Sequence, residues 1–439
     1  MIKLIEVKEF DKIICNADYK YDDRYKYIEP PVFDKLKAFI CGYAGSGGNA
    51  DVLDFMRIGF KREAGDIITI QNYAGLIQVS ENCQIQVLPK ISLCNNNDDT
   101  SNRRTKRIFL NMLCSIGDFP YKTFNDASLS IDKMNLYEIF IRMYLKETRQ
   151  LVKHGIKSAY TAQENNLGYC KGKLLISQHV QHNIMHKERF YVAYDEFLQD
   201  RPENRLVKAT LLKLQKQTGS AENSREIRQL LAMFGMVNPS VNYQKDLSES
   251  VMDRSMKDYR ILLPWSEVFL TNKGFTAFSG GKNSRALLFP MEKLYESYVA
   301  QQIKKVFVPM GWDVSIQDRG HYLFNYRNGK TCRQFGLCPD IVLQKDGHVV
   351  IMDTKWKHLE DNPRANYGIK QADMYQMYAY SKKYGTPDIW LLYPVNEEMR
   401  GKEQIFFNSG DGTYVKLHFV DLDNITDNIK ELYNNLCCR

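Results

Sequence analysis

The chain has 439 residues, too many for one typical hydrophobic core, so we expect two or three domains. Its net charge of +8 permits an acidic partner such as nucleic acid but does not require one. The N-terminal residues are charged throughout and no run of about 18 apolar residues occurs, so we expect neither a secretion signal nor a membrane span. Scattered cysteines without a Cys-x-x-Cys pair favour reduced thiols in the cytoplasm.

Residues 1–100 are predicted to form a β-rich domain. Short apolar runs at 67–70, 76–79 and 83–88 are separated by turn residues, and apolar and glutamine side chains alternate along the last two. The glycine-rich stretch 42–48 lacks the Gly-Lys-Ser/Thr ending of a phosphate-binding loop, so we interpret it as an exposed loop. The polar segment 92–107, where this domain ends, is predicted to be a linker or long loop.

Residues 101–280 are predicted to form a mainly helical middle domain. Apolar side chains recur at helical spacing from Ile108 onward, and a long helix is expected over 132–154, ending before Gly155. Further helices are expected at 205–217 and 223–236.

Two segments of this middle region resemble ligand-binding motifs without matching them. His179, His182 and His186 have a spacing that could suit a metal, but no carboxylate lies between the first two. We therefore interpret them as surface histidines of a polar helix. The glycine-rich segment 279–284 departs from a phosphate-binding loop at two required positions, so we expect no nucleotide to bind this chain and place a domain boundary there.

Residues 281–439 alternate between helical and strand patterns. The predicted elements are a helix at 290–307, strands at 314–316 and 322–326 before an Asn328-Gly329 turn, two central strands within 337–357, a helix at 369–384 and a strand at 389–393. This order predicts an α/β sandwich around a mixed sheet, and the whole chain is predicted to be a multi-domain α/β protein.

The stretch 337–357 consists of two apolar runs around Asp346-Gly347, a strong signal for a two-residue hairpin turn. With these two residues as the loop, Lys345 faces His348. Continuing the register outward places Asp340 opposite Asp353, and residues opposite each other on one face have Cβ atoms ~5 Å apart.

Lys355 follows Asp353 by two residues and therefore points to the same face as the two carboxylates. Facing carboxylates repel unless a cation lies between them, and hard oxygen ligands without a nearby His or Cys favour Mg²⁺ or Mn²⁺. The two facing carboxylates, Asp340 and Asp353, together with Lys355 indicate metal-assisted phosphodiester hydrolysis. In this reaction Lys355 would orient the attacking water. A salt-bridged Asp–Lys pair at the end of a sheet explains the strand pattern equally well.

The Pro-Asp pair at 339–340 and the Asp-x-Lys triplet at 353–355 resemble the motif of the PD-(D/E)xK nuclease superfamily, whose fold is an α/β sandwich. In many members a preceding helix supplies another acidic metal ligand. Here Glu292 and Glu296 are available, and Glu296 is the better match. The resemblance implies four metal ligands, namely Glu296, Asp340, Asp353 and Thr354.

A later helix matches the Gln-x-x-x-Tyr pattern of superfamily members in the RecB branch. Gln376 and Tyr380 carry this pattern, and a spacing of four puts both on one helix face. The resemblance implies that they support the site or contact DNA, and simple helix packing is the alternative.

Over most of its length the chain resembles the McrC family, the nuclease subunits of McrBC-type modification-dependent restriction systems. The similarity lies in GLIQVSENCQIQVLPKI at 75–91, LLFPMEKLYESYV at 287–299 and the segment 367–380. It implies a hexameric McrB-like AAA+ GTPase as partner, stimulation of its GTP hydrolysis, and cleavage of double-stranded DNA in defence against modified foreign DNA. It also implies that the partner reads the methylated base and binds the β-rich N-terminal domain.

Two other functions stay open. The chain could be a regulatory subunit that activates the motor without cutting, or a stand-alone nuclease of the RecB branch. The complete set of Asp340, Asp353 and Lys355 argues against the first, and about 275 residues without a nuclease motif argue against the second.

Overall fold

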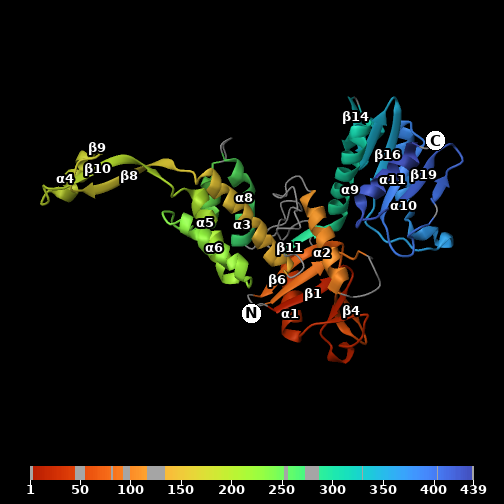
Figure 1. The fold of residues 1–439 in the computed structure, drawn as a ribbon, viewed down its shortest axis with the longest axis horizontal. Coiled ribbons are helices and arrows are strands. Elements are labelled where there is room, and N and C mark those ends of the chain that lie inside the picture. The colour runs from red at the N-terminus through yellow and green to blue at the C-terminus, as the bar shows by residue number, and fades with distance from the viewer. Residues whose placement is uncertain are drawn as a thin grey trace. The chain divides into compact units, whose positions relative to one another are not determined.

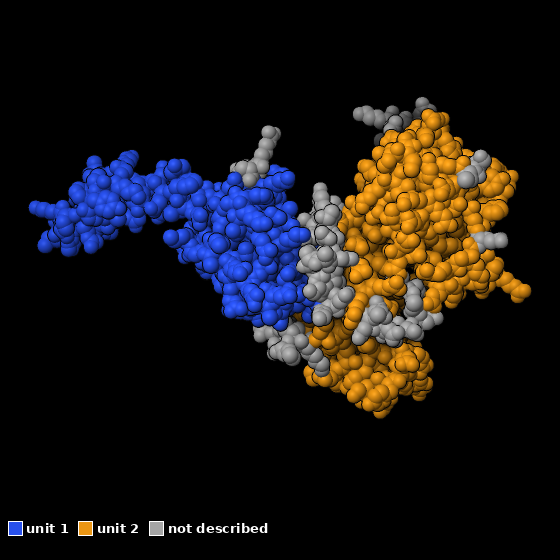
Figure 2. All heavy atoms as spheres, in the orientation of Figure 1, with its two compact units in different colours: residues 1, 134–286 blue, residues 2–133, 287–439 orange. Residues whose placement is uncertain are grey.

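The structure, a computed structural model, describes residues 3–44, 55–80, 83–91, 99–115, 134–251, 256–271, 286–328, 330–402 and 404–437. It divides into two compact units (Figure 2): unit 1 contains residues 1 and 134–286, and unit 2 contains residues 2–133 and 287–439. Helices and several sheets are mixed along the chain, which confirms the α/β class. The three predicted domains, with boundaries at 100 and 280, stay a prediction. No helix of the described residues has the length and apolar character needed to cross a membrane.

The N-terminal part of unit 2 contains two four-stranded sheets, which confirms the predicted strands at 67–70, 76–79 and 83–88. One sheet has the order β1-β7-β6-β11, formed by Lys3–Lys8, Cys83–Leu88, Tyr73–Ser80 and Ala286–Pro290. The other has the order β3-β2-β5-β4, formed by Lys26–Tyr27, Lys12–Ile14, Gly65–Ile70 and Met56–Lys61. Strand β11 thus adds a segment from far along the chain to the N-terminal sheet (Figure 1).

Gly75 permits this addition of β11. A Cβ atom at this position would lie 1.9 Å from the carbonyl oxygen of Leu287. The φ of Gly75, +142°, is also one that residues other than glycine rarely adopt. Any side chain at Gly75 would therefore push β11 away from β6.

Two predictions in this part are wrong. Residues 42–44 belong to helix α1 (Pro30–Ala44) and not to a loop, while the rest of the 42–48 stretch lies outside the described residues. Residues 99–107, predicted as linker, lie in helix α2 (Asp99–Cys114). The polar half of α2 is held by Glu6 of β1, which accepts a hydrogen bond from Asn102 Nδ2 at 2.7 Å and pairs with Lys106 Nζ at 3.2 Å.

Unit 1 contains a helical core, as predicted. Its helices are α3 (Leu136–His154), α5 (Pro202–Gln217), α6 (Ala221–Met233), α7 (Tyr243–Glu249) and α8 (Lys257–Thr271). The predicted helix over 132–154 begins only at Leu136, because the Asn135 side chain caps it by accepting a hydrogen bond from the Glu138 amide at 2.9 Å. It ends before Gly155, whose φ of +93° confirms the predicted glycine stop.

Unit 1 also contains an arm that the prediction of a mainly helical region missed. Strands β8 (Ala159–Leu167) and β10 (Phe190–Leu198) pair antiparallel along their full length, and β9 (Lys173–Leu174) and helix α4 (Ile176–Asn183) complete it (Figure 1). The strands have no continuous buried face, so they lack the apolar alternation that identifies a strand in sequence.

The histidine cluster lies on this arm. The rings of His179 and His182 stack on those of Phe190 and Tyr191, with centroids 6.1 and 5.1 Å apart. His186 follows the helix, and its Nδ1 lies 3.1 Å from a carboxylate oxygen of Glu188. Each histidine therefore has a local partner within the arm or directly beside it.

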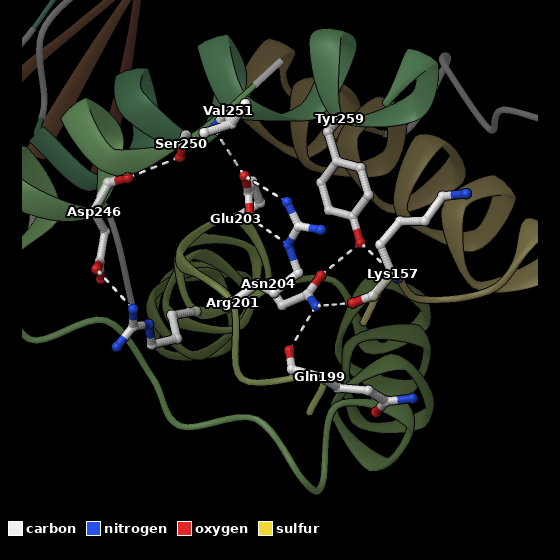
Figure 3. A network of polar contacts seen from close by, with 10 residues as sticks. Lys157, Gln199, Arg201, Glu203, Asn204, Asp246, Ser250, Val251 and Tyr259 are labelled. Carbon is white, nitrogen blue, oxygen red and sulfur yellow. Dashed lines mark hydrogen bonds and ion pairs between the residues drawn. The ribbon is translucent and has the colours of Figure 1, made fainter. Parts of the chain in front are cut away.

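A buried polar network holds the base of the arm (Figure 3). Asn204 of α5 is fully buried and donates from Nδ2 to the carbonyl oxygens of Lys157 and Gln199, at 2.9 and 2.7 Å. These residues stand just outside the two arm strands. Tyr259 of α8 donates its hydroxyl to Asn204 Oδ1 at 2.5 Å, and Glu203 accepts from the Val251 amide at 3.0 Å. One side chain thus ties both ends of the arm to the helical core.

We predict that Asn204→Ala lowers the free energy of unfolding by about 1–3 kcal/mol, because two part-buried carbonyl groups lose their donor and the buried Tyr259 hydroxyl loses its acceptor. Chemical denaturation of the full chain measures this, and hydrogen exchange should increase at the base of the arm. Asn165→Ala, which removes an exposed bond to Tyr194 on the arm, is the matched control and should change stability by less than about 0.5 kcal/mol. Equal effects of the two substitutions would contradict the role given to Asn204.

The C-terminal part of unit 2 is built on a mixed six-stranded sheet with the order β12-β15-β16-β17-β19-β18. Its strands are Asp313–Ile316, Ile341–Lys345, His348–Thr354, Asp388–Pro394, Tyr414–Val420 and Phe406–Asn408. The strands β16, β17 and β19 run parallel, and the remaining pairs are antiparallel. A separate hairpin joins β13 (Tyr322–Asn328) to β14 (Lys330–Gly336), and Gly329 of the predicted turn lies outside the described residues.

Helices α9 (Met291–Phe307), α10 (Gln371–Tyr384) and α11 (Ile425–Cys437) accompany this sheet (Figure 1). The predicted helices at 290–307 and 369–384 are confirmed, although Pro290 is the residue before the first turn of α9 and not within it. Met377 and Tyr380 of α10 are buried in one core cluster with Ile351 of β16. Because side chains alternate along a strand, Asp353 points to the same face as Ile351, toward α10.

Candidate active site

The hairpin of β15 and β16 has the predicted register. Lys345 pairs with His348 and Ile341 pairs with Met352. Asp346 and Gly347 both have positive φ, +49° and +79°, as a two-residue turn of this kind requires. The local turn chemistry therefore sets which side chains meet at the far end of the hairpin.

At that end the structure brings Asp340, Asp353, Thr354 and Lys355 together. Asp340 Oδ2 accepts hydrogen bonds from the amide and the hydroxyl of Thr354, at 2.7 and 2.6 Å. Asp353 is only 1% exposed, and its Oδ2 forms an ion pair with Lys355 Nζ at 2.6 Å. The two aspartates thus lie at neighbouring strand ends, each held by a residue of the Asp-x-Lys triplet.

Helix α9 presents Glu296 to this group. Its Oε1 accepts a hydrogen bond from Gln317 Nε2 at 2.8 Å, and the Gln317 amide donates to the carbonyl oxygen of Asp340 at 2.9 Å. Glu292, the other candidate on this helix, instead accepts from Asn72 Nδ2 at 3.1 Å. Of the two glutamates, Glu296 is thus the one linked through Gln317 to Asp340.

Gln317 is a site residue that the sequence analysis missed. It follows strand β12 and has a φ of +51°, a conformation that residues other than glycine seldom adopt. Local strain of this kind often marks a functional position, but no sequence motif identifies it.

Helix α10 connects to the same group through Gln376 and Tyr380. Lys355 Nζ donates to Gln376 Oε1 at 3.3 Å, and Gln376 Nε2 donates to the Tyr380 hydroxyl at 2.7 Å. Tyr380 in turn donates to the carbonyl oxygen of Cys338 at 3.1 Å. This chain of bonds links Lys355 to the residues just before Asp340. Gln376 and Tyr380 are four residues apart, so both take part in this chain of bonds from one face of α10.

Burial raises the pKa of all three carboxyl groups. For Asp353, burial is the largest cause, the charge of Asp340 adds to it, and the Lys355 ammonium opposes it. The pKa values of Asp340 and Glu296 are also raised, chiefly by burial. Burial lowers the pKa of Lys355, but Asp353 more than offsets this effect, so the pKa is raised overall. All three carboxyl groups are therefore harder to ionise in this site than in water, although a lysine lies among them.

The chemistry of these groups suits a bound cation, although their present arrangement does not form a complete site. Among the described residues, no three His, Cys, Asp or Glu side chains are already arranged to hold a metal ion. However, Asp353 Oδ2 is shielded from solvent and accepts no hydrogen bond of normal geometry within the described part of the chain, even though Lys355 Nζ is near. A buried oxygen in this state, beside two further carboxyl groups with raised pKa, fits the ligand chemistry of a hard divalent cation.

The same pKa shifts predict a pH-dependent stabilisation in Glu296→Gln. The folded-state pKa of Glu296 is raised, so its ionisation costs stability above that pKa and costs nothing below the unfolded value. In EDTA the variant should therefore unfold at a higher temperature than the wild type at pH 8, and the difference should vanish near pH 4.

Glu292→Gln, one turn earlier on α9, is the control. Its carboxylate accepts a hydrogen bond from Asn72, so this substitution should not give the stabilisation expected of Glu296→Gln. A stabilisation by Glu296→Gln that is the same at both pH values would contradict the electrostatic account.

The family of the chain follows from a comparison with known protein families. The family described as the McrBC 5-methylcytosine restriction system component matches residues 68–394. The chain belongs to this family. The match spans both units and includes Asp340, Asp353 and Lys355, and it confirms the family resemblance found in the sequence.

Solved structures show a relative with the same fold. The chain matches one from an assembly of Thermococcus gammatolerans McrB AAA+ hexamers with bound McrC, with a TM-score of 0.70 and 18% identity over 99% of this chain and 100% of that chain. A cryo-EM structure of the Thermococcus gammatolerans McrBC complex matches 70% of this chain and 87% of that chain, with a TM-score of 0.49 and 20% identity. None of the curated proteins matches the chain.

Proposed function

We propose that this McrBC-family chain is the nuclease subunit of a restriction complex, with a PD-(D/E)xK site that hydrolyses DNA phosphodiester bonds. The observation that carries the proposal is the convergence of Asp340, Asp353 and Lys355 at one end of the β15–β16 hairpin. Glu296 of α9 completes the group. Buried, mutually repelling carboxylates are costly to a fold, and a phosphodiesterase site that binds a divalent cation gives them a use.

The cation would be Mg²⁺ or Mn²⁺, with Glu296, Asp340, Asp353 and Thr354 as the residues that would hold it. When bound, such an ion polarises phosphoryl oxygens and makes coordinated water more acidic. The Thr354 hydroxyl and amide fix the orientation of the Asp340 carboxylate through two hydrogen bonds. This fixation reduces the reorganisation needed when the ligands gather.

Lys355 supplies the positive charge of the chain itself. Its ammonium lies between Asp353 Oδ2 and Gln376 Oε1, so its position is set from β16 and from α10. In this place it can orient a water molecule and stabilise negative charge on the phosphoryl oxygens. Gln376 and Tyr380 act as supporting residues that keep the lysine in place.

The partner we propose is an AAA+ GTPase hexamer of the McrB type, because a chain of the same fold occurs in a solved assembly of such hexamers with bound McrC. The chain would stimulate the partner's GTP hydrolysis and bind no nucleotide itself. The partner would read the methylated base and move along double-stranded DNA in the cytoplasm, and this chain would cut the DNA. We propose the β-rich N-terminal domain as the partner-binding end.

A regulatory subunit without cutting activity is the second candidate. It is favoured by one observation, that the described carboxylates are not already arranged as a three-residue metal site. In a regulatory subunit, the Asp353–Lys355 ion pair would be purely structural, and no metal ion would bind to Asp353.

Asp353→Ala separates the two candidates. We expect it to reduce DNA cleavage by about a thousandfold or more, because the buried ligand is lost, and to leave stimulation of the partner GTPase unchanged. Cleavage and GTP hydrolysis are measured on the same reconstituted complex. Asp313→Ala, which removes an exposed carboxylate from β12 of the same sheet, is the control and should cut normally. If Asp353→Ala loses GTPase stimulation but still cuts, the assignment of roles is wrong.

Cation binding is measurable without DNA. Mg²⁺ should raise the unfolding temperature of the wild type, and the increase should be larger at pH 8 than at pH 5, because the carboxyl groups with raised pKa bind a cation only when ionised. The increase should be absent in Asp353→Asn. A shift of equal size in wild type and variant would place the cation elsewhere.

A further inference from the structure

Trp356 connects the two elements that carry the candidate site. It directly follows Lys355, is 5% exposed, and packs its indole against Tyr295 with ring centroids 5.3 Å apart. Tyr295 is fully buried on α9 and directly precedes Glu296. A displacement of the indole would therefore move the neighbours of two site residues at once.

The polar edge of Trp356 is held by Glu9, from the N-terminal sheet. The indole N–H donates to both carboxylate oxygens of Glu9, at 3.3 Å each. Glu9 directly follows β1, is 1% exposed, and also accepts a hydrogen bond from the Lys90 amide at 2.8 Å. All of these residues lie within unit 2.

A second bond joins the same two segments. His358 Nε2 lies 2.8 Å from the carbonyl oxygen of Lys90, a distance at which the ring N–H donates to it. Glu9 and Lys90 follow the paired strands β1 and β7, and the Glu9 amide itself donates to the carbonyl oxygen of Leu88 at 3.0 Å. The segment after β16 is therefore held at two points by one edge of the N-terminal sheet.

The carboxylate of Glu9 is costly at this place. Burial is the main cause that raises the pKa of Glu9 to about 8, and its hydrogen bonds with Lys90 and Trp356 only partly offset that effect. A buried acid with no part in the reaction needs another explanation, since an apolar residue would pack here at lower cost. Its bonds to the residue next to Lys355 supply one.

We propose that Glu9 is a positioning residue for the nuclease site: from the N-terminal sheet it holds Trp356, and through Trp356 it sets the positions of Lys355 and Glu296. This inference rests on the proposed nuclease function. It makes cleavage depend on how the N-terminal sheet is seated on the segment after β16, so that a change in this sheet is transmitted to the cutting site.

The experiment compares Glu9→Ala, Glu9→Gln and Trp356→Phe with wild type in the reconstituted complex. Glu9→Ala and Trp356→Phe should each lower the cleavage rate at saturating DNA about ten- to a hundredfold, since small misplacements of catalytic groups have effects of this size. KM for DNA and GTPase stimulation should stay unchanged. Glu9→Gln keeps an oxygen that accepts the indole N–H and should restore most of the rate. The double variant, Glu9→Ala with Trp356→Phe, should be no slower than either single one.

Glu6→Ala is the matched control, because Glu6 lies on the same strand but bonds to Gln86, Asn102 and Lys106. It should cut at the wild-type rate. The proposal is overturned if Glu9→Ala cuts normally, if Glu6→Ala loses as much activity, or if the effects of Glu9→Ala and Trp356→Phe multiply.

A second measurement does not need cleavage. Hydrogen exchange of the amides at 355–358 should increase in Glu9→Ala and stay unchanged in Glu6→Ala. If the wild type does not cut DNA, the proposed function fails, and the exchange result still decides whether Glu9 holds this segment. Unchanged exchange in Glu9→Ala overturns the proposal.

Discussion

The buried carboxylate of Asp353 is the constraint on which the site depends. Its pKa is raised by burial and by the charge of Asp340, and Lys355 is the cation that lies against it. It lies near the end of β16, in a run of five buried residues. Burial of such a group lowers the stability of the fold even with Lys355 beside it, and the proposed metal site gives its presence at the end of β16 a use.

The surrounding elements can be understood from this constraint. Thr354 orients Asp340, Gln317 joins Glu296 to the Asp340 backbone, and Gln376 holds Lys355. Each of these polar side chains comes from a different part of the unit, so the site exists only when β12, β16 and α10 are packed together. Glu9 extends the same principle to the N-terminal sheet, which reaches the site through Trp356.

The hairpin and its facing aspartates could be predicted because they depend on local rules. Alternation of side chains and the Asp346-Gly347 turn fix the register without reference to the rest of the fold. The placement of Gln376 and Tyr380 on one helix face could be predicted in the same way, because it follows from their spacing of four residues. Gln317 and Glu9 could not be found in this way, because their contacts join segments distant in sequence and no motif marks them.

Helix α2 and the arm strands were predicted wrongly for related reasons. The polar half of α2 is anchored by bonds from Asn102 and Lys106 to Glu6 of β1, tertiary contacts that composition does not reveal. The arm strands β8 and β10 lack a buried face and so carry no apolar alternation. The base of the arm is fixed instead by Asn204, which bonds to the backbone beside both strands (Figure 3).

Cleavage by the wild-type protein decides whether this chain is a nuclease. The chain is combined with an McrB-type GTPase, GTP and methylated or unmethylated DNA, with Mg²⁺ or with EDTA. We expect cleavage of methylated DNA that requires Mg²⁺ and both proteins. Absence of product under every methylation state, with GTP hydrolysis still stimulated, would contradict it and assign the chain a regulatory role.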